Sequence, residues 1–234
     1  VLSPLLSVPH AAAAFGLMFL IQPSGWIARA FSPWATGWQR PPDVLIVQDP
    51  MGLALMLGLV VKEVPFLLLI SLAALRTIDA PERARVASSL GYGRLAGWLF
   101  TVFPALYPRI RLPVYAVLAY SMSVVDMAII LGPTTPPPLS VQIVRWMGEP
   151  DLAQRSLASA AALLQGALVL AALVGWRLGE IGLAHLGCRL LQQGHRWRQD
   201  GLLRRLTLVA CGLSVAGVLL SILSLALWSV AARW

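Results

Sequence analysis

Three ionisable side chains stand inside apolar stretches of this sequence: Lys62, Glu63 and Asp126. A charged group at membrane depth is costly, so such residues commonly face a water-filled path or one another. They could line a translocation path and carry a coupling ion, with Lys62 paired to Asp126. The alternative is a polar network that only pins helices together. Because successive residues of a helix point about 100° apart, Lys62 and Glu63 cannot line one face together.

No pattern typical of bond-making chemistry accompanies these residues. The sequence has no Gly-x-x-x-x-Gly-Lys phosphate loop, no His-Glu-x-x-His and no Gly-x-Ser-x-Gly elbow. Its histidines and cysteines are not at metal-ligand spacing; they are His10, His185, His195, Cys188 and Cys211. We therefore expect a protein that is not an enzyme and has no catalytic residues, metal or cofactor.

The composition indicates an integral membrane protein. Hydrophobic residues make up 58% of the chain, charged residues only 12%, and the mean hydropathy is +0.76. The formal charge of +8 comes almost wholly from arginines at the ends of apolar runs. That distribution fits membrane topology better than a nucleic-acid surface. We expect an all-α, polytopic transmembrane helical bundle that contacts membrane lipid and binds no nucleic acid.

Five apolar stretches are long enough to span a bilayer; they are residues 5–26, 51–75, 112–131, 157–176 and 206–230. The arginine-rich intervals 76–111 and 177–205 are predicted to be cytoplasmic. The proline-rich stretch 132–138 cannot be helical and is predicted to be external. Within the spans, His10 is expected to be a hydrogen-bonded packing residue, and Gln165 is expected to bond across helices.

The interval 76–111 is predicted to hold a short surface helix over residues 80–90. Asp79 stands at the N-cap position, Pro81 suits the first turn, and Glu82 stands where a capping-box partner would. This helix is too short and too charged to span. It is expected to lie at the cytoplasmic surface of the membrane.

Gly91 and Gly93 follow this helix and permit the backbone conformation that a helix stop requires. The chain is therefore expected to turn there. A second helical piece should begin near Arg94 and end at Pro104.

The residues of this loop resemble the cytoplasmic coupling loop of ABC-importer permeases. The family pattern is Glu-Ala-Ala, three residues, Gly, nine residues, then Ile-x-Leu-Pro. With Gly91 as the anchor, Ala87, Gly91 and Pro104 match. The departures from the pattern are Arg85, Val86, Thr101 and Phe103. The family glutamate, which helps to fix the loop against the ATPase, is replaced by Arg85, and Glu82 one turn earlier is the candidate substitute.

The resemblance extends over about residues 4–176. The flanking sequence has a spacing of aromatic and apolar residues similar to that of fused permeases, a subgroup similar to importers of thiamine and ferric iron. It implies a permease subunit of the bacterial inner membrane that forms the solute path and couples it to a separate ATPase. Its partners would be ABC ATPase subunits, a periplasmic solute-binding protein and a second permease half or copy. The coupling residues would be Glu82, Arg85, Ala87, Gly91, Gly93 and Pro104.

The resemblance also implies a domain organisation. Residues 1–182 would be the core of one permease half, 183–205 a basic cytoplasmic linker, and 206–234 the first span of a second half, so that the chain is part of a longer polypeptide. Two other functions compete with this one. The first is an ion-coupled secondary transporter that uses Lys62, Glu63 and Asp126, and the second is a non-transporting membrane scaffold.

Overall fold

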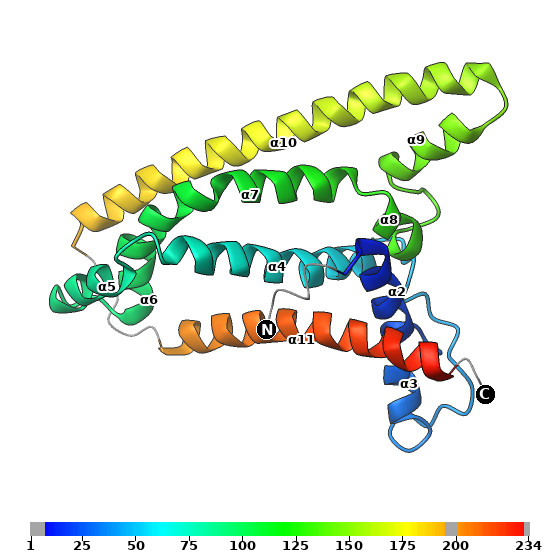
Figure 1. Ribbon diagram of the computed structural model, residues 1–234, viewed down its shortest axis with the longest axis horizontal. Coiled ribbons are helices and arrows are strands. Elements are labelled where there is room, and N and C mark those ends of the chain that lie inside the picture. The colour runs from blue at the N-terminus through cyan, green and yellow to red at the C-terminus, as the bar shows by residue number, and fades with distance from the viewer. Residues whose placement is uncertain (1–7, 195–200, 232–234) are drawn as a thin grey trace. The chain divides into compact units, whose positions relative to one another are not determined.

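The computed structural model describes residues 8–194 and 201–231, and its regular elements there are helices, with no strand in that part of the chain (Figure 1). The elements are α2 His10–Ile21, α3 Trp26–Phe31, α4 Leu53–Leu75, α5 Ala80–Ser89, α6 Arg94–Gly97, the π-type turn Trp98–Val102, α7 Phe103–Ser123, α8 Asp126–Leu131, α9 Leu139–Gly148, α10 Leu152–Gln192 and α11 Gly201–Ala231. The prediction of an all-α fold is confirmed. His195 and the first three residues of the predicted span 5–26 lie outside the described residues.

Three helical stretches among the described residues are long and apolar enough to cross a membrane: His10–Phe31, Leu53–Leu75 and Leu152–Gln192. The predicted span 51–75 coincides with α4, and the predicted span 157–176 lies inside α10. α10 runs on to Gln192, so the first part of the predicted linker 183–205 is helical. The predicted fifth span, 206–230, lies within α11.

The predicted third span, 112–131, differs from the observed helices. α7 begins nine residues earlier than expected and ends at Ser123, and α8 follows after a break. The prediction that Pro104 ends a helix is wrong, because Pro104 is the second residue of α7. A proline ring clashes with the carbonyl four residues before it in an α-helix. The π-type turn directly before α7 changes the hydrogen-bond ladder at that point, and we attribute the continued helix to it.

The chain divides into two compact units. The first comprises Val1–Pro65, Ser121–Gly166 and Leu213–Trp234. Its core lies where α2 and α8 pack together, with Leu17, Met127 and Leu131 almost fully buried. A side chain on Gly58 of α4 would place its Cβ 2.6 Å from Leu131 Cδ1, so this glycine permits the close approach of α8 to α4.

The second unit comprises Phe66–Tyr120 and Ala167–Gly212. Its core is formed by Ile78, Val102, Leu106 and Ile110. The last three are four residues apart and therefore share one face of the π-type turn and α7. Ile78 lies in the turn that leads from α4 into α5, so this core fixes the base of α5 to α7. Figure 1 shows α5 and α6 beside the beginning of α7.

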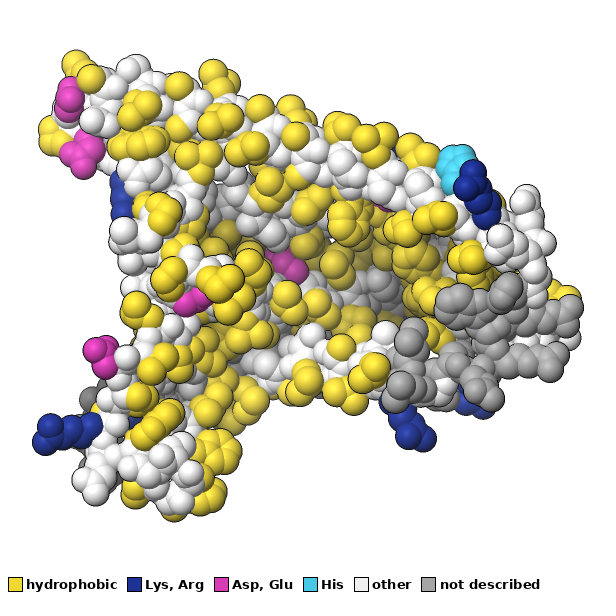
Figure 2. Space-filling view, turned by 180° about the vertical axis from the view of Figure 1, so that it is seen from behind, with side chains coloured by type: hydrophobic (Ala, Val, Ile, Leu, Met, Phe, Trp, Pro, Cys, Tyr) yellow, Lys and Arg dark blue, Asp and Glu magenta, His cyan; other side chains and the backbone are white. Residues whose placement is uncertain are grey.

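α10 exposes much of its apolar surface. Hydrophobic side chains lie along its length at the upper edge of Figure 2, and large examples are Leu163, Leu170 and Leu183. Lipid or another membrane helix can cover such a surface, whereas water would make it costly.

Candidate functional site

The helix α5 buries a single side chain, that of Ala87. Ala87 is 1% exposed, whereas every other residue from Pro81 to Ser89 is exposed. The charged residues Glu82 and Arg85 are therefore available to a partner. The burial of one small residue stabilises the packing of α5 on its own unit only slightly, since the apolar area removed from water is small.

The partner of Ala87 is Gly97 of α6. A Cβ atom placed on Gly97 would lie 2.9 Å from the Cβ of Ala87, which is closer than such atoms pack. The Thr101 hydroxyl lies 2.7 Å from the Gly97 carbonyl oxygen and 3.4 Å from that of Arg83, so it faces both helices. Thr101 stands at a position where the family pattern has isoleucine. Here its hydroxyl adds a polar contact beside the Ala87–Gly97 packing.

Gly91 makes the turn between α5 and α6. Its φ is +83°, in the left-handed region that favours glycine, as the sequence predicted. Gly93 has φ −62° and ψ 162°, an extended conformation that any residue adopts, so it is not required for the turn. The Tyr92 N–H donates to the Ala87 carbonyl oxygen at 3.1 Å and closes the end of α5.

The predicted capping box is not formed. Asp79 occupies the N-cap position of α5, but its side chain makes no capping hydrogen bond, and its ψ of 61° departs from the extended geometry that capping requires. The first turn is closed instead by the Arg83 N–H, which donates to the Asp79 carbonyl oxygen at 3.0 Å. Glu82 is thus an exposed first-turn residue rather than a cap. Pro104 is also exposed, and it lies on α7 rather than on α5.

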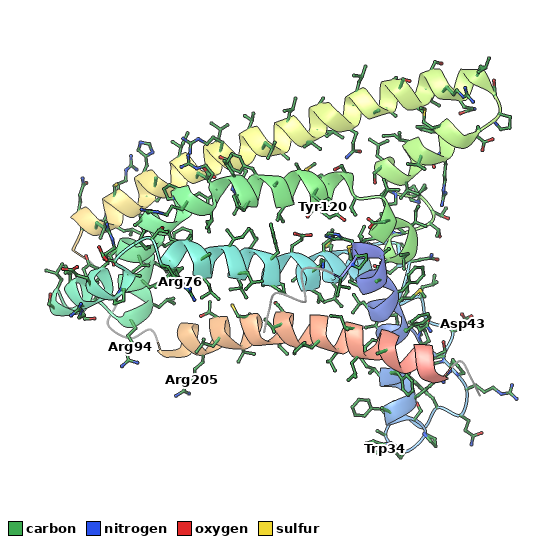
Figure 3. The ribbon with its side chains drawn as sticks, in the orientation of Figure 1. Trp34, Asp43, Arg76, Arg94, Tyr120 and Arg205 are labelled. Carbon is green, nitrogen blue, oxygen red and sulfur yellow. The ribbon has the colours of Figure 1, made fainter. Side chains whose placement is uncertain are left out.

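The second unit also exposes basic side chains outside α5. Arg94 begins α6, and Arg205 lies in the first part of α11. Figure 3 shows both side chains directed away from the ribbon. The Arg109 guanidinium donates to the carbonyl oxygens of Ala105 at 2.6 Å and Thr77 at 3.4 Å, so it also holds the turn before α5.

Lys62 and Glu63 are buried in α4, and both bond to the segment that begins α2. The Lys62 ammonium donates to the Val8 carbonyl oxygen at 2.7 Å. Glu63 Oε1 lies 3.3 Å from His10 Nε2. The two side chains point in different directions, as neighbours on a helix must, yet their partners are only two residues apart. Asp126 is exposed at the start of α8.

The break between α7 and α8 is supported by polar side chains. Gln165 Nε2 donates to the Met122 carbonyl oxygen at 2.6 Å, which confirms the expectation that Gln165 bonds across helices. The Ser140 hydroxyl donates to the Val124 carbonyl oxygen at 2.7 Å. Carbonyl groups freed by a helix break at membrane depth need such partners.

Asp49 is a capping residue that the sequence reasoning missed. Its carboxylate accepts hydrogen bonds from the N–H groups of Leu53 at 2.8 Å and Ala54 at 2.9 Å, at the beginning of α4. Chiefly the Ala54 bond, and then the Leu53 bond, lower the pKa of the Asp49 carboxyl below its usual value. An aspartate just before a long apolar run was the available signal.

Glu180 of α10 is a second residue that the sequence reasoning missed. Its side chain is 10% exposed and accepts hydrogen bonds from the hydroxyls of Tyr107 and Tyr115. It also pairs with Arg177 and Arg111. The signal was the spacing of Tyr107, Arg111 and Tyr115, which are four residues apart and so share one face of α7.

A surface hollow of about 560 Å³ lies beside α3 in the first unit. Arg29, Arg40 and Trp38 are among the residues that line it. They precede the predicted span 51–75, which leads into the predicted cytoplasmic interval 76–111, so we predict that they lie on the external side.

Comparison with known proteins gives a family resemblance for three quarters of the chain. No protein-family model matches the sequence, and no solved structure matches it. The chain is 36% identical over 177 residues to the inner membrane ABC transporter permease protein YnjC of Escherichia coli (strain K12). The match covers 74% of this chain and 33% of YnjC, so the chain spans about a third of the length of that relative. The resemblance to ABC transporter permeases is confirmed, whereas the importer type and the likeness to thiamine and ferric-iron permeases stay predictions.

Proposed function

We infer that this chain is part of the membrane-spanning permease of an ABC transporter in the bacterial inner membrane. The 36% identity to an inner membrane ABC transporter permease over 177 residues supports this, as do helices of membrane-spanning length. The structural observation that carries the proposal is α5, a short charged helix with only Ala87 buried, fixed beside a long helix of the second unit. A separate ATPase could contact most faces of such a helix.

We propose further that the transporter is an importer, in which this chain contributes to the solute path. ATP binding and hydrolysis by separate ATPase subunits would move α5. Close packing of Ala87 on Gly97 would pass the movement to α6, and the chain then continues in helical conformation through α7. Two packed arrangements biased by nucleotide are sufficient for such coupling, and the permease needs no bond-making residue of its own.

The remaining partners follow from the same proposal. A periplasmic solute-binding protein would deliver the solute, and a second permease half or copy would complete the path. The domain organisation that we propose is a permease half over residues 1–182, a linker over 183–205 and the first span of a second half over 206–234. The coupling residues would be Glu82, Arg85, Ala87, Gly91, Gly93 and Pro104.

Purification of the full-length permease from membranes under mild detergent tests this function. We expect an ABC ATPase to co-purify and solute uptake into vesicles to require ATP. Uptake that follows an imposed pH gradient without ATP would instead indicate a secondary transporter that uses Lys62, Glu63 and Asp126. Absence of both an ATPase and uptake would indicate a scaffold.

A further inference from the structure

Three hydrogen-bond donors and one further cationic group converge on the carboxylate of Glu180. The Tyr107 hydroxyl donates to Oε1, while the Tyr115 hydroxyl at 3.1 Å and Arg177 Nη1 at 2.7 Å donate to Oε2. Arg111 Nε lies 3.5 Å from Oε2. The Trp176 indole N–H donates to the Tyr107 hydroxyl oxygen at 2.9 Å and extends the network. All these residues belong to α7 and α10 within the second unit.

The network lies on a face of α7 next to its apolar stripe. Val102, Leu106 and Ile110 pack with Ile78 at the base of α5, whereas Tyr107, Arg111 and Tyr115 are each one or five residues further along and face Glu180. α7 is thus bound on one side to the turn that carries α5 and on a neighbouring side to α10. Hydrogen bonds to an ionised carboxylate are roughly twice as strong as those between neutral groups, so these side chains tie α7 to α10.

We propose that Glu180 is a positioning residue that makes the adjoining parts of α7 and α10 move as one body when α5 is displaced. This inference rests on the proposed function, because the displacement comes from the ATPase. Without the Glu180 carboxylate, Arg111 and Arg177 lose a shared anion and the two tyrosines lose their acceptor. α7 could then move with α5 without a matching movement of α10.

Cys188 provides a native reporter of α10, since it is exposed and lies eight residues beyond Glu180 on the same helix. The experiment uses the full-length permease with its co-purified ATPase in nanodiscs, with Cys211 and any other cysteine of the complex replaced by serine so that Cys188 is the labelled thiol. The rate at which a maleimide labels Cys188 is measured without nucleotide and after trapping with ATP and vanadate. The wild-type rate should change on trapping. In Glu180→Gln the nucleotide-dependent change in the labelling rate should be on the order of tenfold smaller. A factor of that size corresponds to the loss of one charge-assisted hydrogen bond.

Arg155→Gln is the matched control, because Arg155 is an exposed charge on the same helix, far from Cys188 in sequence and outside the Glu180 network, and it should respond as the wild type does. Tyr107→Phe combined with Tyr115→Phe serves as a second variant if Glu180→Gln does not fold, and it should weaken the response in the same direction. A full response in the variants overturns the inference, as does a wild-type rate unchanged by nucleotide in a complex that hydrolyses ATP. If no ATPase co-purifies, the proposed function itself fails, and the inference falls with it.

Discussion

His10 Nε2 lies 3.3 Å from Glu63 Oε1, and the neighbouring Lys62 donates to the carbonyl oxygen of Val8, two residues before His10. The charges of α4 therefore hold the beginning of α2. This arrangement favours the interpretation in which Lys62 and Glu63 form a structural network rather than an ion relay. It also agrees with the expectation that His10 is a hydrogen-bonded packing residue.

Replacing Lys62 with methionine separates these two interpretations. The change removes the charge and leaves the part-buried Val8 carbonyl without this donor, so we expect a loss of about 1–3 kcal/mol in stability. The melting temperature in detergent measures the loss, and ATP-dependent uptake by the surviving folded protein should stay near the wild-type level. Complete loss of uptake in a protein of wild-type stability would favour the relay.

Gly91→Val should abolish ATP-driven uptake without removing the protein from the membrane. The φ of +83° costs a β-branched residue about 1–2 kcal/mol, so α5 would be displaced from α6. Uptake and the amount of ATPase that co-purifies are the measurements. Gly182→Val is the control, because a Cβ there meets no atom within 4 Å. Normal uptake by the Gly91 variant would contradict the coupling role of α5.

Ala87→Leu should detach α5 from α6. Ala87 already lies as close to Gly97 as small residues allow, and overpacking of this kind typically costs about 1–3 kcal/mol. Limited proteolysis at the arginines of α5 should become faster, and ATP hydrolysis should lose its coupling to uptake. Ala84→Leu adds the same side chain on the exposed face of α5 and should leave the rate of proteolysis unchanged.

The stability of the protein should depend on pH through Asp49. Its pKa is lowered in the folded state, so its contribution is fully present above the unfolded-state pKa and is lost as the pH falls through the lower folded-state value. Melting temperatures recorded from pH 6 downward should therefore fall less steeply below about pH 4 for Asp49→Asn than for the wild type. Asp43→Asn, at an exposed aspartate of the same loop, should follow the wild-type curve.

Much of this fold could be predicted because apolar length and charge are local properties. The span 51–75, the helix 80–90 and the left-handed Gly91 all follow from such signals, and the structure places α4, α5 and a positive φ there. The continuation of the helix through Pro104 was missed, since it depends on a π-type turn that propensity does not reveal. The contacts of Glu180 with Tyr107 and Tyr115 were also missed, because they join residues 73 and 65 positions apart. Only the helical spacing of the tyrosines hinted at that face.

The length of α10 has a mechanical consequence. Its 41 residues extend over roughly 60 Å, about twice the thickness of the hydrocarbon layer. If the predicted span 157–176 fills that layer, the following sixteen residues, 177–192, form a helical extension of about 24 Å beyond it. A small tilt of this helix inside the membrane would then produce a larger displacement of its C-terminal end, where a water-soluble partner could bind.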